Sequence, residues 1–401
     1  MLCSFAAAPA PLPAPQNAAE LHRPPAASDF VGDAACMSCH QQESRFWSTN
    51  PHHLDSALAT PATVLGDFTP GHNFLRTRDP NLVFAMIRDG DTLYQSAINI
   101  ADPKNLKGTA ETFDIAVGSG RRGQTSLYWK GDALFELPVS WWTTTHDWVN
   151  SPGYPDGEVH FNRPIIPRCL ECHTTWFEFL GDPNRFTRAN MILGIGCEKC
   201  HGPGREHVER ETSLHPPAPG SPQEAIVNPA HLPHDRQMDL CAYCHAGVGE
   251  SLQPAESYRP GDVLADYLAI TPPPSDQPVD VHGNQVSALE RSRCYASGKL
   301  TCSTCHNVHE RQEDVDSYST HCLQCHTVQS CGRFKTMGEA IRTKCVECHM
   351  PEGRSTALTS HSDGQLLAPE LRRHRIAIYP DADLPAALRS PGAIEQKSLA
   401  R

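Results

Sequence analysis

Residues 302–349 read CSTCHNVHERQEDVDSYSTHCLQCHTVQSCGRFKTMGEAIRTKCVECH, and they contain the pattern Cys-X-X-Cys-His three times. Four more copies precede them, so the chain of 401 residues has seven. In this pattern two thiols can bond covalently to one haem, and the adjacent histidine then binds its iron. For a chain with 17 cysteines and 22 histidines, about 0.04 copies are expected by chance. The sequence therefore predicts seven covalent haem c groups.

The motifs are numbered 1 to 7 in chain order, and each supplies two cysteines and one histidine. The predicted attachment cysteines are Cys36, Cys39, Cys169, Cys172, Cys197, Cys200, Cys241, Cys244, Cys302, Cys305, Cys322, Cys325, Cys345 and Cys348. The predicted proximal iron ligands are His40, His173, His201, His245, His306, His326 and His349. Zinc clusters and redox-active Cys-X-X-Cys pairs are the competing interpretations, but neither requires a histidine after every second cysteine.

The rest of the composition offers little material for a conventional core. Only 39% of the residues are hydrophobic, and there are 35 prolines and 27 glycines. The haems themselves would then form much of the interior, with short helices and loops around them. We therefore expect a mainly α fold with much irregular structure and a haem core. The net charge of −12 argues against nucleic acid as a partner, because phosphate binding needs clustered lysine and arginine.

The uneven spacing of the motifs predicts how the chain is divided. Motifs 5 to 7 crowd into residues 302–349, whereas a long gap separates motif 1 from motif 2. In this gap, residues 82–87 and 92–100 flank Asp89-Gly90, which predicts a β-hairpin, and residues 124–129 and 134–139 predict a second one. Residues 1–29 are expected to be a leader or disordered linker, and one interpretation is that they are the remnant of an export signal. The motif 1 segment follows at 30–60, and a small β-rich insert at 61–150. A domain carrying motifs 2 to 7 is expected at 151–350, and a C-terminal segment with a polar tail at 351–401. Short helices are expected beside the motifs at 41–47, 235–244 and 336–345.

A second protein ligand on each iron decides the chemistry, because an iron with two protein ligands transfers electrons and an open iron can bind a substrate. The candidate distal ligands are His53, His207, His282, His309, His361 and His374. His309 follows His306 by three residues, so both leave the same side of a helical turn and cannot bind opposite faces of one iron. His309 would therefore serve a neighbouring haem, and the same reasoning applies to His207. His52 competes with His53 for one role, and the irons are expected to be mainly bis-histidine.

The motifs also predict the cellular compartment. Haem is attached to Cys-X-X-Cys-His outside the bacterial cytoplasm, so the protein is expected to be exported to the periplasm or beyond. Residues 2–14 are small and apolar, but no lysine or arginine precedes them, as a secretory signal requires. No apolar run is long enough for a membrane span. In an oxidising compartment Cys294 and Cys331 can form a disulfide, and two free thiols are the alternative.

Several stretches resemble a known family. ACMSCHQQESRFWSTNPHH at 35–53 and GCEKCHGPGREHV at 196–208 are similar to multihaem cytochromes of the cytochrome c-552/c-554 type. VGSGRRGQTSLYWKGDALFELPVSWW at 117–142 and LTCSTCHNVHE at 300–310 resemble a subgroup of exported bacterial multihaem proteins. The resemblance implies electron transfer outside the cytoplasm, and it implies distal roles for His53, His207 and His309. The seven motifs depart from the four haems of the small carrier, so its haem pairing cannot be copied.

Two functions follow from these observations. The first is an electron-transfer protein that passes electrons between a donor and an acceptor protein, alone or within a multihaem assembly or homo-oligomer. The second is a reductase or oxidoreductase of a small nitrogen or sulfur species at one five-coordinate haem. Basic or imidazole groups above that iron would be needed, for which the candidates are Arg121, Arg122, His146 and His160. The surplus of histidines favours the electron-transfer protein over the catalyst.

Overall fold

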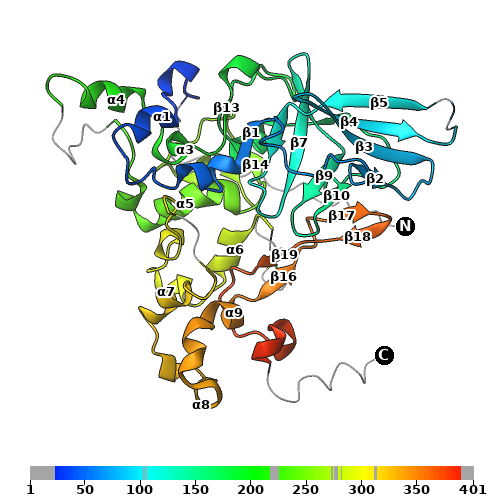
Figure 1. Cartoon of the computed structure of the whole chain (residues 1–401). Helices are drawn as coiled ribbons and strands as arrows, with labels where there is room; N and C mark the ends of the chain where they lie inside the picture. The colour runs from blue at the N-terminus through cyan, green and yellow to red at the C-terminus, as the bar shows by residue number, and fades with distance from the viewer. Residues whose placement is uncertain are drawn as a thin grey trace, which may run out of the picture.

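The computed structural model describes residues 23–389 except 103, 105, 217–224, 272–273, 275–278, 281 and 311–313. Most of the predicted leader and polar tail thus lies outside the described residues. Two antiparallel sheets form a β region that Figure 1 shows on one side of the molecule. The four-stranded sheet has the order β2 (Phe74–Arg76), β3 (Leu82–Asp89), β4 (Thr92–Asn99), β5 (Lys107–Thr112). The other sheet has the order β1 (Ser56–Leu58), β6 (Ile115–Val117), β7 (Gly123–Lys130), β8 (Ala133–Glu136), β11 (Arg163–Pro164). Two further strands extend this sheet from β7: β9 (Val139–Trp142) pairs with β7, and β10 (Asp147–Asn150) pairs with β9.

Both hairpins expected in this region are confirmed. β3 and β4 pair in register from Leu82–Asn99 to Asp89–Thr92, around Gly90 with φ 60°. A positive φ is what a tight hairpin turn needs, and glycine adopts it without a steric penalty. β7 and β8 pair in the same way. The two sheets share one hydrophobic core, in which Phe84, Met86 and Trp148 are at most 1% exposed.

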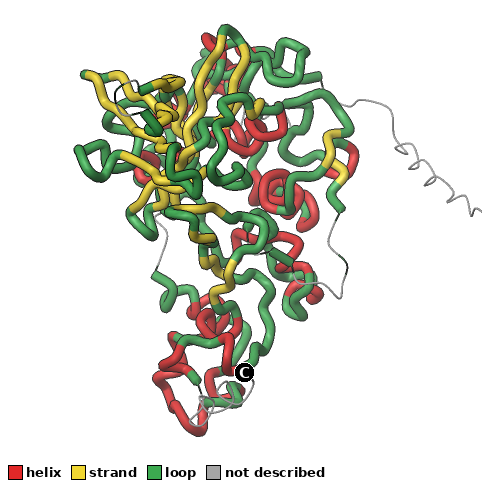
Figure 2. The backbone as a smooth tube through the Cα atoms, turned by 90° about the vertical axis from the view of Figure 1, so that its right-hand side faces the viewer, coloured by secondary structure: helices red, strands yellow, loops and turns green. Residues whose placement is uncertain are grey.

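The described helices are short and lie mostly beside the motifs. They are α1 (Asp33–Met37), α2 (Pro167–His173), α3 (Cys197–His201), α4 (Arg205–Glu211), α5 (His234–His245), α6 (Gln285–Glu290), α7 (Ser319–Leu323), α8 (Phe334–Met337) and α9 (Cys345–His349). Figures 1 and 2 both show the segment from α7 to α9 at the end of the molecule away from the β region. No described helix is both long enough and apolar enough to cross a membrane.

Three helices were expected beside motifs, and the structure differs in two of them. α5 confirms the helix expected at 235–244. Residues 41–46 form turns instead, and only the 3₁₀ segment Trp47–Thr49 follows. The helix expected at 336–345 is interrupted, because Gly338 adopts φ 58° and ends α8 before a 3₁₀ segment, Gly338–Thr343, begins. A residue with that φ cannot continue a right-handed helix.

The expectation of a mainly α fold is wrong. Of the residues that the structure describes, 27% are helical and 23% are in strands. Most of the strand residues belong to the two sheets of the β region, whose longest strands are longer than most of the helices beside the motifs. The linkers add short strands, which leave several motifs and pair with chain returning from further along the sequence. β12 (Thr174–Trp176) leaves motif 2 and pairs with β13 (Ile192–Leu193), which leads into motif 3. The other linker pairs are β14 (Glu250–Ser251) with β15 (Leu268–Ala269), and β16 (Glu352–Arg354) with β19 (Glu370–Arg372).

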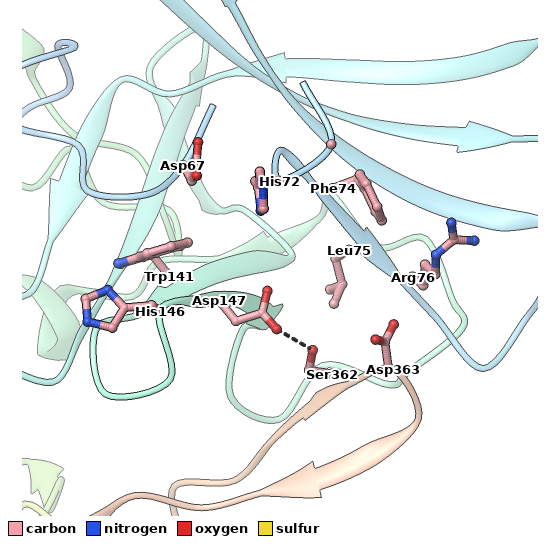
Figure 3. A pocket seen from close by; sticks show the side chains of 11 residues that line it. Asp67, His72, Phe74, Leu75, Arg76, Trp141, His146, Asp147, Ser362 and Asp363 are labelled. Carbon is pink, nitrogen blue, oxygen red and sulfur yellow. Dashed lines mark hydrogen bonds between the residues drawn. The ribbon is translucent and has the colours of Figure 1, made fainter. Parts of the chain in front are cut away.

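The chain after motif 7 returns to the β region. The hairpin of β17 (Ser360–Ser362) and β18 (Gln365–Leu367) lies against β10, and Figure 1 shows it beside the sheets. Ser362 donates a hydrogen bond to Asp147, 3.4 Å away. A cavity of about 130 Å³ lies at this junction, and Figure 3 shows the side chains that line it. The chain that follows motif 7 therefore connects the motif 7 end of the molecule with the β region.

Candidate haem-attachment sites

All seven motifs contain a helical turn. Motifs 3 and 7 are the helices α3 and α9, and motifs 2 and 4 form the C-terminal ends of α2 and α5. Motifs 1, 5 and 6 lie only partly in helices, but their histidine amides still donate helical bonds of 2.9–3.0 Å to the carbonyl of the first cysteine. Helical turns place residues i, i+3 and i+4 on one face. Each motif therefore presents its two thiols and its imidazole on the same side.

The motifs contact one another through their cysteines. Four pairs of cysteine side chains from different motifs lie close together: Cys36 with Cys197, Cys172 with Cys244, Cys241 with Cys302, and Cys322 with Cys345. These pairs connect motif 1 with 3, 2 with 4, 4 with 5, and 6 with 7. The helices pack in the same pairs, for example α1 on α3 and α7 on α9. Motifs that are distant in sequence are therefore neighbours in space.

Two carboxylates lock motif 1 to motif 3 reciprocally. Glu198, the second residue of motif 3, accepts hydrogen bonds from the amides of Val31 and Gly32, which precede α1 (3.0 and 2.9 Å), and from Gly204 at 2.8 Å. In return Asp33 of α1 accepts from the amide of Cys197, the first residue of α3, at 2.8 Å. Amides at the start of a helix have no partner within it, so each carboxylate satisfies donors of the other helix.

Four of the motif histidines face a second imidazole. The ring centres are 6.3 Å apart for His40 and His207, 6.2 Å for His245 and His52, 6.0 Å for His201 and His309, and 6.3 Å for His306 and His374. Two metal–nitrogen bonds of about 2 Å each, with ring centres about 1 Å behind their nitrogens, would put the centres about 6 Å apart. The spacing therefore fits one iron between the two rings of each pair. Within the described ranges, no imidazole has this spacing to His173, His326 or His349.

Comparisons with known proteins show which proteins this chain resembles. The family model for cytochrome c554 and c-prime matches residues 156–202. The multiheme cytochrome MtrA of Shewanella baltica is 22% identical over 171 residues, which are 41% of this chain and 38% of MtrA. The crystal structure of the outer cell wall cytochrome OcwA resembles this one with a TM-score of 0.57, at 17% identity, over 88% of this chain and 81% of OcwA. The chain is thus similar to multihaem c-type cytochromes in part of its sequence and in its fold.

The remaining candidate distal ligands are placed differently from those in the four pairs. His53 packs on Trp47 with ring centres 3.4 Å apart, and its Nδ1 lies 3.9 Å from Asp33, whereas its competitor His52 faces His245. His282 is close enough to His173 and His245 for their charges to lower its pKa, although burial has the larger effect. His361 lies in β17, within the hairpin that returns to the β region. The ligand roles of all these histidines stay predictions.

Hydrogen bonds from Nδ1 set the orientation of three motif histidines. His201 donates to the carbonyl of Val227 (2.8 Å) and His349 to that of Ala377 (2.9 Å). His173 donates to a charged acceptor, Oδ2 of Asp55, at 2.7 Å. A proton on Nδ1 leaves Nε2 free to bind a metal. Burial lowers the pKa of His201, and it has the same effect on His173, but there the hydrogen bond and charge of Asp55 outweigh it and raise the pKa.

A buried ionic cluster lies where motifs 2, 3 and 4 meet. Nζ of Lys199, from motif 3, is 3.1 Å from Oε1 of Glu256, and both side chains are 9% exposed. Arg168 bonds Glu171, from motif 2, at 3.2 Å, and Glu171 accepts from the amide of Glu256 at 3.2 Å. Tyr243, from motif 4, covers both cations. Burial raises the pKa of Glu256 to about 7, which Lys199 opposes.

Sequence reasoning missed these polar groups. These groups occupy variable positions inside their motifs, which the pattern Cys-X-X-Cys-His leaves unspecified: Glu171, Glu198, Lys199 and Tyr243. A charged residue inside a motif was the available signal, since on a helix the variable positions point away from the face that carries the thiols and imidazole. Their partners, however, come from distant segments, and nothing in the sequence connects them.

The leftover cysteines and the alternative catalytic residues lie away from the imidazole pairs. Cys294 and Cys331 are unbonded thiols in the structure. Arg122 lies 3.9 Å from Glu352, and His160 bonds Glu158 at 2.8 Å on the surface of the β region. His146 packs on Trp141 at the cavity of Figure 3. Arg121 is exposed in the turn between β6 and β7.

Proposed function

We propose that this protein carries seven covalent haem c groups, most of them bound by two histidines, and passes electrons along them between redox partners. The four imidazole pairs at 6.0–6.3 Å carry this proposal. When attached, the haems supply one-electron chemistry. The chain holds neighbouring attachment sites in contact and, at four of the motifs, provides an imidazole for each face of an iron.

The contacts between motifs support a definite order of sites. The thiol pairs join motifs 1 and 3, 2 and 4, 4 and 5, and 6 and 7. Motifs 3 and 4 are also close, because Nζ of Lys199 lies 5.6 Å from the ring centre of Tyr243. Motifs 5 and 6 are close as well, because the ring centre of Tyr318, the residue before α7, lies 5.3 Å from that of His306 in motif 5. The sites would thus run 1–3–4–5–6–7, with motif 2 as a side branch on motif 4.

The haem content tests the proposal most directly. The pyridine haemochrome spectrum of the purified holoprotein is expected to give seven haems per chain, one for each motif. Substituting both cysteines of motif 7, Cys345→Ser and Cys348→Ser, should lower the count by one. A count other than seven in the unchanged protein would contradict the proposal.

Replacing a distal histidine that comes from another motif's segment should change only the haem that it faces. His309→Ala removes the imidazole 6.0 Å from His201. We expect the haem of motif 3 to become high-spin, because it loses one of two strong-field ligands, while the other haems keep their signals. The electron paramagnetic resonance spectrum of the ferric protein measures this. His160→Ala, at a solvent-accessible ion pair of the β region, is the control and should leave the spectrum unchanged.

One observation keeps the second function open as a proposal. In the part of the chain that the structure describes, His173, His326 and His349 lack an imidazole at the spacing of the four pairs. An iron with an open position at one of these motifs could reduce or oxidise a small nitrogen or sulfur species. A high-spin signal in the unchanged protein that shifts with nitrite, hydroxylamine or cyanide would favour this function. Exclusively low-spin signals would count against it.

The cellular compartment of the protein is part of the same proposal. Covalent attachment of haem c, together with the likeness to OcwA, a cytochrome of the outer cell wall, supports export to the periplasm or beyond. Electron donors and acceptors would then be other redox proteins, and assembly into a larger multihaem unit or a homo-oligomer would lengthen the path.

A further inference from the structure

We propose that Asp55 is a positioning residue that lowers the reduction potential of the haem at motif 2 through its hydrogen bond to His173. The inference rests on the proposed function, since it assigns a property to one of the haems proposed there. The bond joins Oδ2 of Asp55 to Nδ1 of His173 at 2.7 Å.

The protein holds both partners of this bond in place. Asp55 ends the 3₁₀ segment His53–Asp55, and its backbone carbonyl accepts from the amide of Gly118 at 2.6 Å. The next residue, Ser56, donates from its hydroxyl to the carbonyl of His173 at 2.5 Å. The amide of Gly194 in turn donates to the Ser56 hydroxyl at 2.8 Å. Two consecutive residues thus fix the carboxylate and the backbone of the histidine together.

The other motif histidines with a described Nδ1 partner have neutral acceptors. His201 and His349 bond backbone carbonyls, and Nδ1 of His306 lies 3.4 Å from the Tyr318 hydroxyl. Within the described residues, the carboxylate on His173 is therefore the exception. The other carboxylate whose charge acts on His173, Glu136, is paired with Arg163 at 3.0 Å.

The physical consequence has a definite sign. A carboxylate that accepts the Nδ1 proton makes an imidazole a more basic ligand than a carbonyl does. A more basic ligand and an added negative charge both favour the ferric iron, which carries one more positive charge than the ferrous iron. The haem at motif 2 is therefore harder to reduce than a haem whose proximal histidine donates to a carbonyl. Because motif 2 lies beside motifs 3 and 4, its electron would enter and leave through these neighbours.

A charge-neutral replacement tests the inference. Asp55→Asn keeps an oxygen that can accept the proton and removes the charge. We expect one component of a spectroelectrochemical titration to move to higher potential by at least a tenfold change in its reduction equilibrium, which is about 59 mV for one electron. Asp55→Glu restores the charge and should restore the low-potential component. Asp91→Asn, in the exposed turn between β3 and β4, should leave every component in place.

The outcomes separate the inference from the proposed function. Seven haems in Asp55→Asn with an unchanged titration would overturn the role of Asp55 and leave the seven haems standing. Fewer than seven in the unchanged protein would instead contradict the proposed function. If Asp55→Asn fails to load haem, the unchanged protein with ¹⁵N-labelled histidine decides. In its NMR spectrum, the chemical shift of one Nδ1–H group must differ from the others because that group has a charged acceptor. A spectrum with only carbonyl-bonded Nδ1–H groups would overturn the inference.

Discussion

Glu198→Ala is expected to destabilise the folded protein by about 4 kcal/mol, because a buried carboxylate that satisfies several backbone amides leaves them all without a partner when it is removed. Glu198 is 3% exposed and accepts from the amides of Val31, Gly32 and Gly204. The first two donors lie at the start of α1 and the third precedes α4. The substitution therefore loosens the N-terminal segment from motif 3 and not only the site of the mutation.

The thermal unfolding midpoint and the haem content of the variant measure this effect together. Glu198→Gln keeps one acceptor oxygen and should lose less stability than Glu198→Ala. Glu209→Ala, on the exposed side of α4, is the matched control and should behave like the unchanged protein. A Glu198→Ala variant with unaltered stability and a complete motif 1 haem would show that the Asp33–Glu198 pair does not hold the two motifs together.

This pair also shows how far the sequence predicts the structure. The haem motifs and the β3–β4 hairpin were predictable because each depends on residues within one turn or one hairpin. The contact between α1 and α3 was not, since Glu198 and Gly32 are 166 residues apart. The balance of helix and strand was missed because the β region holds most of the strand residues while the helices beside the motifs are short. Linker strands such as β12 add to this, and they pair with partners that a local pattern does not reveal.

The distal histidines lie between these cases. The spacing of His309 after His306 already implied a role on another haem, and the structure brings it to His201. His52 and His53 are adjacent in an irregular segment, so no periodicity distinguishes them. The structure turns His52 towards His245 and stacks His53 on Trp47. In a regular helix or strand, by contrast, neighbouring side chains point in directions that the pattern fixes.

Lys199→Met is expected to cost about 3–5 kcal/mol of stability, because removing one partner of a buried ion pair leaves the other charge uncompensated. Without Lys199, Glu256 stays buried beside Glu171 with a single cation, Arg168, so above neutral pH its ionised form lacks its counter-charge. The loss should be measured by denaturant unfolding of the holoprotein. Replacing the solvent-accessible Lys344, which pairs with Asp316 at 2.8 Å, is the control and should have little effect, since solvent screens such pairs.

The pH dependence of this loss follows from the raised pKa of Glu256. In the folded protein that pKa is about 7 instead of the ordinary 4.5. Between these values the folded state holds a proton that the unfolded state has released, so this group makes stability fall as the pH rises from about 4.5 to about 7. Lys199→Met should extend this fall to higher pH, because the cation that opposes the shift is gone.

The double variant Lys199→Met/Glu256→Gln distinguishes the ion pair from a general packing effect. Removing both charges leaves no uncompensated group, so much of the stability lost in Lys199→Met should return, and the pH dependence between about 4.5 and 7 should flatten. If the double variant is as unstable as the sum of the two single variants, the pair is not coupled. In that case the meeting point of motifs 2, 3 and 4 is held by the packing of Tyr243 and its neighbours rather than by charge.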